Sequence, residues 1–175
     1  LMTSHSEIKD QINRIWDKFW EGGISNPLTV IEQITYLMFM RLMDMNEMRQ
    51  EKMAARTGKS FTSHFNGSDD PRRWSNLLKV GSEESLQTLR DDVFPHFKTL
   101  AGSDSTFGQF MTDATLMINK PELLRTAMNL INKLPLEQGD LKGDIYEQML
   151  SKLSTAGVAG QFRTPRNIIR MMVEM

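Results

Sequence analysis

The residues best suited to bind a ligand lie near the end of the chain, in the run GQFRTPR at 160–166. Thr164 can cap a helix that Pro165 begins, because the N–H group that proline lacks would be unpaired at that position. The loop ahead of it combines free backbone N–H groups, a helix N-terminus, the ring of Phe162 and two arginines. This combination suits a ligand with a carboxylate and a flat base, although an ordinary capped helix-loop-helix has the same pattern.

Metal and nucleophile chemistry is not indicated elsewhere in the sequence. The histidines are isolated, without paired-histidine spacing, and are interpreted as surface or satisfied core residues: His5, His64 and His96. The chain has no cysteine, which excludes disulfides, thiolate nucleophiles and cysteine-based zinc sites. Glycine-rich loops that cradle phosphate are also missing.

Charged residues cluster at a few places without forming an acid/base dyad. The acidic pairs are explained best as caps, first-turn partners of a helix dipole and solvated faces: Asp69-Asp70, Glu83-Glu84 and Asp91-Asp92. Arg72 and Arg73 stand beside Trp74, a combination that could meet the phosphate and base of a nucleic acid. The simpler interpretation of these two arginines is a solvated helix face.

The elements that must position these residues begin with two helices. An apolar stripe from Ile8 to Phe19 predicts a first helix that starts at a capping box and ends at a pair of glycines. Asn26 then caps a second helix, from Pro27 to about Met48, which is apolar nearly all round. Such a helix must be surrounded by others, so it is predicted to be the core helix of a bundle.

A loop and shorter helices are predicted to follow. The run from Thr57 to Asp70 has two glycines, small polar residues and no sustained period, which is typical of a surface loop. Asp70 can cap one short helix, and Ser82 can cap another that Pro95 ends. A longer helix starts at about Pro121, and a helix-loop-helix completes the chain. No segment alternates with period two for long enough to predict a strand, so the fold is predicted to be all-α.

Composition is that of one globular domain. Hydrophobic residues make up 39% and charged residues 25% of the 175 residues. No signal peptide or membrane span is indicated, since Arg41 and Asp44 interrupt the most apolar run. Together with the absence of cysteine, this favours a cytoplasmic protein. The net charge of −1 gives no general attraction to DNA, so any DNA contact must come from a local patch or from parts of the protein outside this chain.

Two segments resemble a known family. The run GDIYEQMLSKLSTAGVAGQFRTPRNIIRMMVEM at 143–175 resembles the segment that links the N-terminal helical domain to the methyltransferase domain in modification subunits of type I restriction-modification enzymes. Residues 5–45, notably IWDKFW followed by NPLTVIEQITYLMFMRLMD, resemble the helical domain that opens the same family. The resemblance covers essentially the whole chain and is weakest from about 57 to 70.

The resemblance implies an irregular multi-helix bundle with a central apolar helix at 1–139, followed by a helix-loop-helix at 140–175 that leads into a catalytic domain. It implies that the intact protein is an S-adenosylmethionine-dependent, adenine-specific DNA methyltransferase, which flips its target base out of the duplex. The loop would form one wall of the cofactor pocket, through Gln161, Phe162, Arg163, Thr164, Pro165 and Arg166. The implied partners are the DNA specificity subunit, a second modification subunit, the restriction subunit and double-stranded DNA.

Parts of the family pattern are absent or altered. The glycine-rich cofactor turn and the Asn-Pro-Pro-aromatic catalytic motif do not occur, so the catalytic residues are expected beyond Met175. This chain alone is therefore expected to be an inactive N-terminal fragment, with Leu1 left over from cloning. Arg163 follows Phe162 where the family usually has a second aromatic residue, which argues against a stacking role for Arg163.

A second hypothesis comes from a different class of function. The chain contains 14 methionines, which are interpreted first as gap-filling core residues. If they instead formed an adaptable surface, the chain would be a noncatalytic helical adaptor that is complete as it stands and binds a partner helix. The gene beyond codon 175 separates the two hypotheses, because only the methyltransferase requires a glycine-rich turn and an Asn-Pro-Pro-aromatic motif there.

Overall fold

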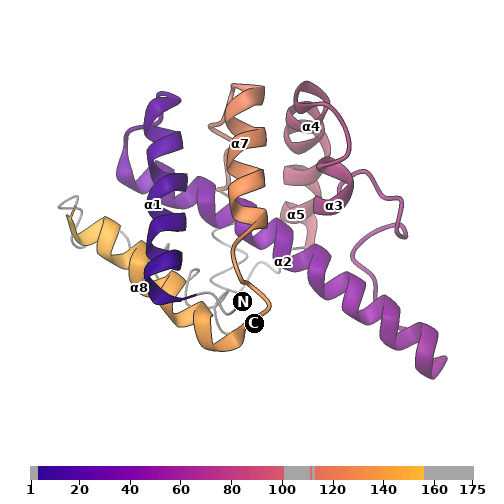
Figure 1. Cartoon of the computed structure of the whole chain (residues 1–175). Helices are drawn as coiled ribbons and strands as arrows, with labels where there is room; N and C mark the ends of the chain where they lie inside the picture. The colour runs from indigo at the N-terminus through magenta and orange to yellow at the C-terminus, as the bar shows by residue number, and fades with distance from the viewer. Residues whose placement is uncertain (1–3, 101–110, 112, 156–175) are drawn as a thin grey trace.

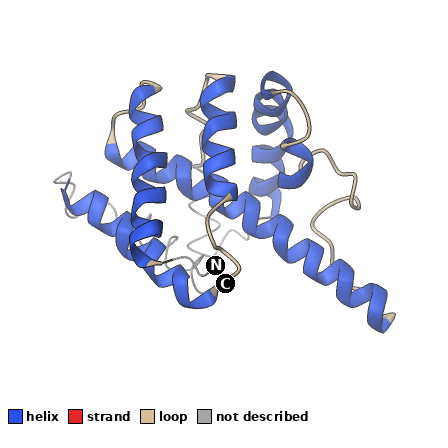
Figure 2. Cartoon of the chain, in the orientation of Figure 1, coloured by secondary structure: helices blue, strands red, loops and turns tan. Residues whose placement is uncertain are grey.

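The computed structural model describes residues 4–100, 111 and 113–155. Within these ranges the chain forms helices, turns and loops, and no strand is drawn (Figure 2). The elements in order are α1 His5–Glu21, α2 Pro27–Thr57, α3 Trp74–Leu77, α4 Ser82–Thr88, the π-helical turn η1 Leu89–Val93, α5 Phe94–Leu100, α7 Pro121–Asn132 and α8 Gly139–Thr155. The prediction of an all-α bundle is confirmed. No described helix is long and apolar enough to cross a membrane.

The first two helices start where the capping residues predict. Ser4 accepts a hydrogen bond from the N–H of Glu7, and α1 ends at Gly22. The Asn26 side chain accepts hydrogen bonds from the N–H groups of Leu28 and Thr29 at the start of α2. These caps satisfy backbone donors that have no partner inside the helix, and so they define both starting points.

The second helix is longer than the apolar pattern predicts. It continues past Met48 to Thr57 and ends at Gly58, whose φ of 72° is left-handed and whose N–H bonds to the Ala54 carbonyl. The additional stretch, residues 49–57, consists mainly of strong helix formers such as arginine, glutamine, lysine and alanine. The apolar stripe therefore marks where the core ends along α2, and helix propensity carries the helix further.

The core is built around α2. Figure 1 shows α1, α7 and the α3–α5 group standing side by side along α2, with α8 below α1, while the C-terminal end of α2 projects past them. Edge-to-face ring pairs join α2 to α5: Tyr36 lies 5.4 Å from Phe94 and Phe39 lies 5.3 Å from Phe97. Along α2 the side chains from 33 to 44 are all buried, as predicted for a core helix.

The region that links α3 to α5 departs from the sequence prediction at one residue. Pro95 does not end the helix, because α5 runs through it to Leu100. The preceding turn is π-helical, and the Phe94 N–H bonds to the Leu89 carbonyl five residues back. This wider turn gives the proline ring space that a regular α-helical turn denies it. Gly81, and not Ser82, is the capping position of α4.

Helices α7 and α8 close the bundle over α1 and α2. The Arg41 guanidinium on α2 donates to the carbonyls of Ile131 and Leu134 at 2.7 and 2.6 Å, which satisfies acceptors at the C-terminal end of α7. Ile145 and Met149 of α8 are fully buried against the bundle. Three described methionines are exposed: Met48, Met53 and Met117. Six others lie in the core, as packing residues should: Met38, Met40, Met43, Met111, Met128 and Met149. The division of the chain at 139/140 stays a prediction.

Candidate functional site

The predicted cofactor-binding residues, Gln161 to Arg166, lie outside the described residues. The same is true of the helix predicted to begin at Pro165. Within the part that the structure describes, charged side chains converge at one place, between the second half of α2 and the loop at 58–73. We describe this region as the candidate site.

A buried arginine joins the loop to α2. Arg73, with 2% of its side chain exposed, donates from Nε to Asp44 at 2.7 Å and from Nη2 to Glu51 at 2.7 Å. Its Nη1 donates to the Gly67 carbonyl at 3.2 Å, and the guanidinium lies 5.7 Å from the centre of the Phe65 ring. Burial alone would lower the pKa of Arg73, but the hydrogen bonds to Glu51 and Asp44 raise it, so the guanidinium keeps its charge.

The acidic partners of this cluster are also fully engaged. The second carboxylate oxygen of Asp44 accepts a hydrogen bond from the Ser75 N–H at 2.8 Å, at the start of α3. Glu47, one turn along α2, is buried and accepts from the Ser63 hydroxyl and from the His64 N–H. The loop is thus attached to one face of α2 by three carboxylates, with few unpaired polar groups inside.

A second cluster organises the same loop locally. Asp70 is 4% exposed and accepts from the Asn66 N–H, the Arg72 N–H and both the Nε and Nη2 of Arg72, at 2.6 to 3.0 Å. Burial would raise the pKa of Asp70, but the hydrogen bonds from the Arg72 side chain and from the backbone N–H groups outweigh it and hold the pKa far below its ordinary 3.8. Asp70 thus caps the turn that starts at Pro71, through the Arg72 N–H, but it does not cap helix α3, whose N-cap position is Arg73 without a side-chain hydrogen bond.

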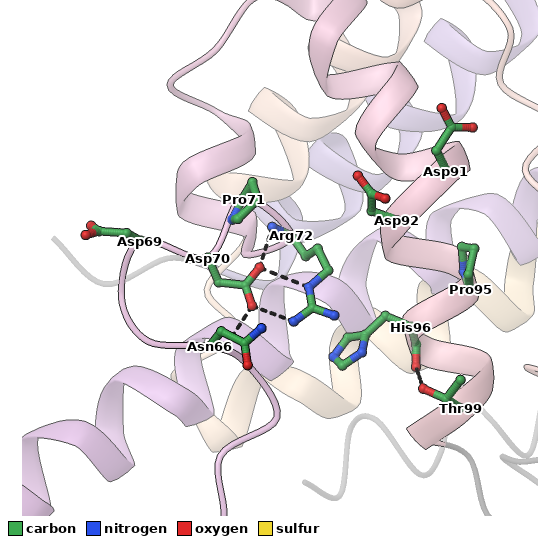
Figure 3. A pocket seen from close by; sticks show the side chains of 10 residues that line it. All are labelled: Asn66, Asp69, Asp70, Pro71, Arg72, Asp91, Asp92, Pro95, His96 and Thr99. Carbon is green, nitrogen blue, oxygen red and sulfur yellow. Dashed lines mark hydrogen bonds and ion pairs between the residues drawn. The ribbon is translucent and has the colours of Figure 1, made fainter.

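An acidic hollow lies beside the pair formed by Asp70 and Arg72. Figure 3 shows Asp70 and Arg72 on the loop across from Asp92 on η1 and His96 on α5, while the side chain of Asp69 points away from them. Asp69 and Asp91 also line the hollow. The hollow has a volume of about 680 Å³ and is open to solvent. Arg72 is already paired with Asp70, so the remaining lining charge is negative.

The hollow is arranged for structure and binding more than for acid/base chemistry. The Nε2 of His96 shares a hydrogen bond with the His64 carbonyl at 2.6 Å. Burial lowers the pKa of His96, although the contact with the His64 carbonyl opposes this. An imidazole that is hydrogen-bonded to a backbone carbonyl fits the prediction of a satisfied histidine. Among the described residues, no group of three or more His, Cys, Asp and Glu side chains is placed to hold a metal ion.

The structure corrects one interpretation and adds one residue. The interpretation of Arg72 and Arg73 as a solvated face is wrong for Arg73, because two acids on α2 lie in register to bury it. Arg125 of α7 was not singled out by sequence, yet it donates to the carbonyls of Leu77, Leu78 and Val80. The sequence feature that could have identified Arg125 is its position as a single arginine among the apolar residues of a predicted helix, and the same holds for Arg41.

The chain matches two family models in succession. Residues 8–131 match the HsdM N-terminal domain, and residues 137–175 match N-6 DNA Methylase. The chain is 28% identical over 163 residues to the type I restriction enzyme EcoEI methylase subunit of Escherichia coli, which covers 87% of this chain and 32% of that protein. The chain thus spans about a third of that relative.

A solved structure has the same fold. It comes from work on complex assembly and conformational transition in the type I R-M system, and it superposes with a TM-score of 0.64 at 19% identity. The match covers 94% of this chain and 35% of the other. At this identity the likeness concerns the arrangement of the helices.

Removing Arg73 should destabilise the chain strongly. Arg73→Met leaves Asp44 charged and buried without its partner, which costs about 3 to 5 kcal/mol of unfolding free energy. The double variant Asp44→Asn/Arg73→Met should recover part of that loss, because the asparagine side chain is neutral and its amide oxygen can still accept from the Ser75 N–H. Urea denaturation of both variants measures the difference, with Lys79→Met as an exposed control. A loss below about 1 kcal/mol for Arg73→Met would show that the cluster contributes little.

Asp70 should make the unfolding free energy of the chain depend on pH in the acidic range. Since its pKa is lowered in the folded state, the stabilisation is present above the ordinary value of 3.8 and is lost as pH falls through the range below it. Between about pH 4 and pH 3, wild type should lose about 1 kcal/mol more unfolding free energy than Asp70→Asn. Urea titrations at several pH values test this, with Asp69→Asn as the exposed neighbour. Parallel pH curves for wild type and Asp70→Asn would contradict the prediction.

Proposed function

Because the chain belongs to the HsdM N-terminal domain family, we propose that it is the N-terminal part of the modification subunit of a type I restriction-modification system. The intact subunit would be an S-adenosylmethionine-dependent DNA methyltransferase that modifies adenine at N6. The chain would supply one wall of the cofactor site together with surfaces that contact DNA and the specificity subunit.

The observation that carries this proposal is the order of the two family matches. A match to the N-terminal domain model at 8–131 is followed at once by a match to the methylase model at 137–175, on a single chain whose described secondary-structure elements are all helices. The second match contains the loop for which the sequence predicts ligand binding. An adaptor that is complete as it stands would not need the opening segment of a methylase.

Within this proposal the described helices form the scaffold and the loop at 161–166 belongs to the cofactor pocket. Helix α8 is anchored to the bundle through Ile145 and Met149, so it offers a firm base for the loop that follows. Phe162 would pack on the cofactor and Thr164 would cap the helix behind it. The specificity subunit, a second modification subunit and the restriction subunit are the proposed protein partners.

The intact subunit, combined with a specificity subunit, should methylate DNA. With labelled S-adenosylmethionine, label should enter duplex DNA, and a nuclease digest should contain N6-methyladenine. The 175-residue chain alone should transfer no label, because a single wall of a pocket provides few of the contacts that offset the lost freedom of a ligand. Methylation of cytosine in place of adenine would refute the base assignment, and absence of any methylation would refute the enzyme.

Two substitutions in the loop should have different effects on the intact protein. Phe162→Ala should weaken cofactor binding by about 1 to 3 kcal/mol while the melting temperature of the apo protein barely changes. Thr164→Ala should cost about 0.5 to 2 kcal/mol of helix stability and loosen the cofactor indirectly, because an N–H group at the helix start loses its acceptor. Thermal melts of the apo protein, paired with cofactor titrations, measure both effects.

The competing role for Phe162 is that of a core residue. In that case Phe162→Ala would lose roughly 3 to 5 kcal/mol of folding stability and would bind the cofactor normally once folded. That result would refute the pocket-wall role of the loop while leaving the methyltransferase assignment intact.

A further inference from the structure

The projecting end of α2 carries a strongly basic face. Arg49, Lys52 and Arg56 recur at intervals of three and four residues, so they lie on one side of the helix, and all three are exposed. Met53 lies beside them, 45% exposed, and shares with them a shallow, open hollow. Lys59 follows directly after the helix and is also exposed. This basic face is defined as Arg49, Lys52 and Arg56, and the end of α2 that carries it projects past the other helices (Figure 1). Arg49 also lines a hollow with Glu137 and Lys142, and Glu137 is itself paired with Arg41.

The acids nearby do not neutralise this face. Asp44, Glu47 and Glu51 recur at intervals of three and four residues on a different side of α2, where the loop at 58–73 covers them. Glu51, the acid closest to the basic face in sequence, is paired with Arg73. Among the described residues, no ion pair is found for Arg49, Lys52 or Arg56. The positive charge of the basic face is therefore available to a binding partner.

Helix stability does not explain these cations. A basic residue near a helix C-terminus is favoured by the helix dipole, and that effect is confined to the last turn. Of the three, Arg56 alone lies in that turn. Arg49 and Lys52 lie one to two turns earlier, so another role must account for them.

The spacing of the three charges fits the backbone of a nucleic acid. From Arg49 to Arg56 the helix rises by about 10 Å, at roughly 1.5 Å per residue. A DNA strand carries about one phosphate per 3.4 Å of its axis, so the face can span about three phosphates. A single exposed helix can follow a backbone without reading its bases.

We propose that the basic face of α2 binds the phosphate backbone of duplex DNA. It is the local patch that a chain of net charge −1 needs for such a contact. The acidic hollow lined by Asp69, Asp91 and Asp92 would repel the same backbone. This inference rests on the proposed function for the presence of DNA and adds the surface that meets it.

The test compares two triple variants of the 175-residue chain that lose the same charge. Arg49→Gln/Lys52→Gln/Arg56→Gln removes the basic face, and Lys9→Gln/Arg14→Gln/Lys98→Gln removes three exposed cations from α1 and α5. Binding to a short fluorescein-labelled duplex of arbitrary sequence is measured by anisotropy between about 50 and 200 mM salt. Circular dichroism melts confirm that each variant is folded.

The loss of DNA binding is expected only when the basic face is removed. Removing the basic face should weaken binding by at least about tenfold at low salt and reduce the slope of log K against log salt by about 2 to 3. The control variant should change affinity by less than about twofold. Arg49→Lys/Arg56→Lys should retain most of the affinity, because backbone contacts require charge more than the shape of the guanidinium.

Other outcomes would overturn the proposal. Equal losses in both triple variants would mean that net charge alone matters. Undetectable binding of wild type to the duplex would remove the basis for the surface. Tighter binding to poly-glutamate than to duplex DNA would assign the arm to an acidic protein partner. If the intact subunit carrying the Arg49, Lys52 and Arg56 substitutions bound and methylated DNA like wild type, the surface would be wrong and the enzyme assignment would stand.

Discussion

The interaction on which the second half of the described structure depends is the buried pairing of Arg73 with Asp44 and Glu51. Two acids that lie two turns apart on α2 are bridged by one guanidinium that comes from a loop. A charge removed from water is tolerated only when its partners and hydrogen bonds are complete. Here the Gly67 carbonyl and the Ser75 N–H complete the set, so the loop, the start of α3 and the helix share one geometry.

The other elements are attached to that geometry through arginines and rings. Arg125 of α7 binds the carbonyls at the end of α3, and the indole N–H of Trp74 donates to Asn132 at 2.9 Å. Arg41 joins the C-terminal end of α7 to α2. Each guanidinium satisfies several carbonyls that a helix end leaves without partners, which a lysine could do less well because its donors are not held in a plane. The bundle is therefore joined at its helix ends by polar contacts and along its length by apolar packing.

The sequence predicted features that depend on residues close together in the chain, and it missed those that depend on residues far apart. Asn26 and Ser4 define helix starts through contacts with residues two or three positions away, so their roles were readable, as was the buried face of α2. The burial of Arg73 depends on acids 29 and 22 positions away, and nothing local distinguishes it from the surface arginine beside it. Pro95 misled for a related reason, because a π-helical turn ahead of it relieved a clash that local rules treat as decisive. The loop at 161–166 lies outside the described residues, so its role is still a prediction from sequence.

The same ion pairs that stabilise α2 also determine the charge it presents. Helix propensity alone would leave residues 49–57 as an exposed and fraying end, since few apolar contacts hold them. Arg73 anchors that end through Glu51 and neutralises the one acid of the segment. The result is a helical end whose cations have no ion-pair partner among the described residues, while the hollow beside the loop at 58–73 is acidic. The net charge of the chain therefore does not describe its surface well. The loop at 58–73 covers the acidic side of α2 and leaves the basic face exposed, although the whole chain is nearly neutral.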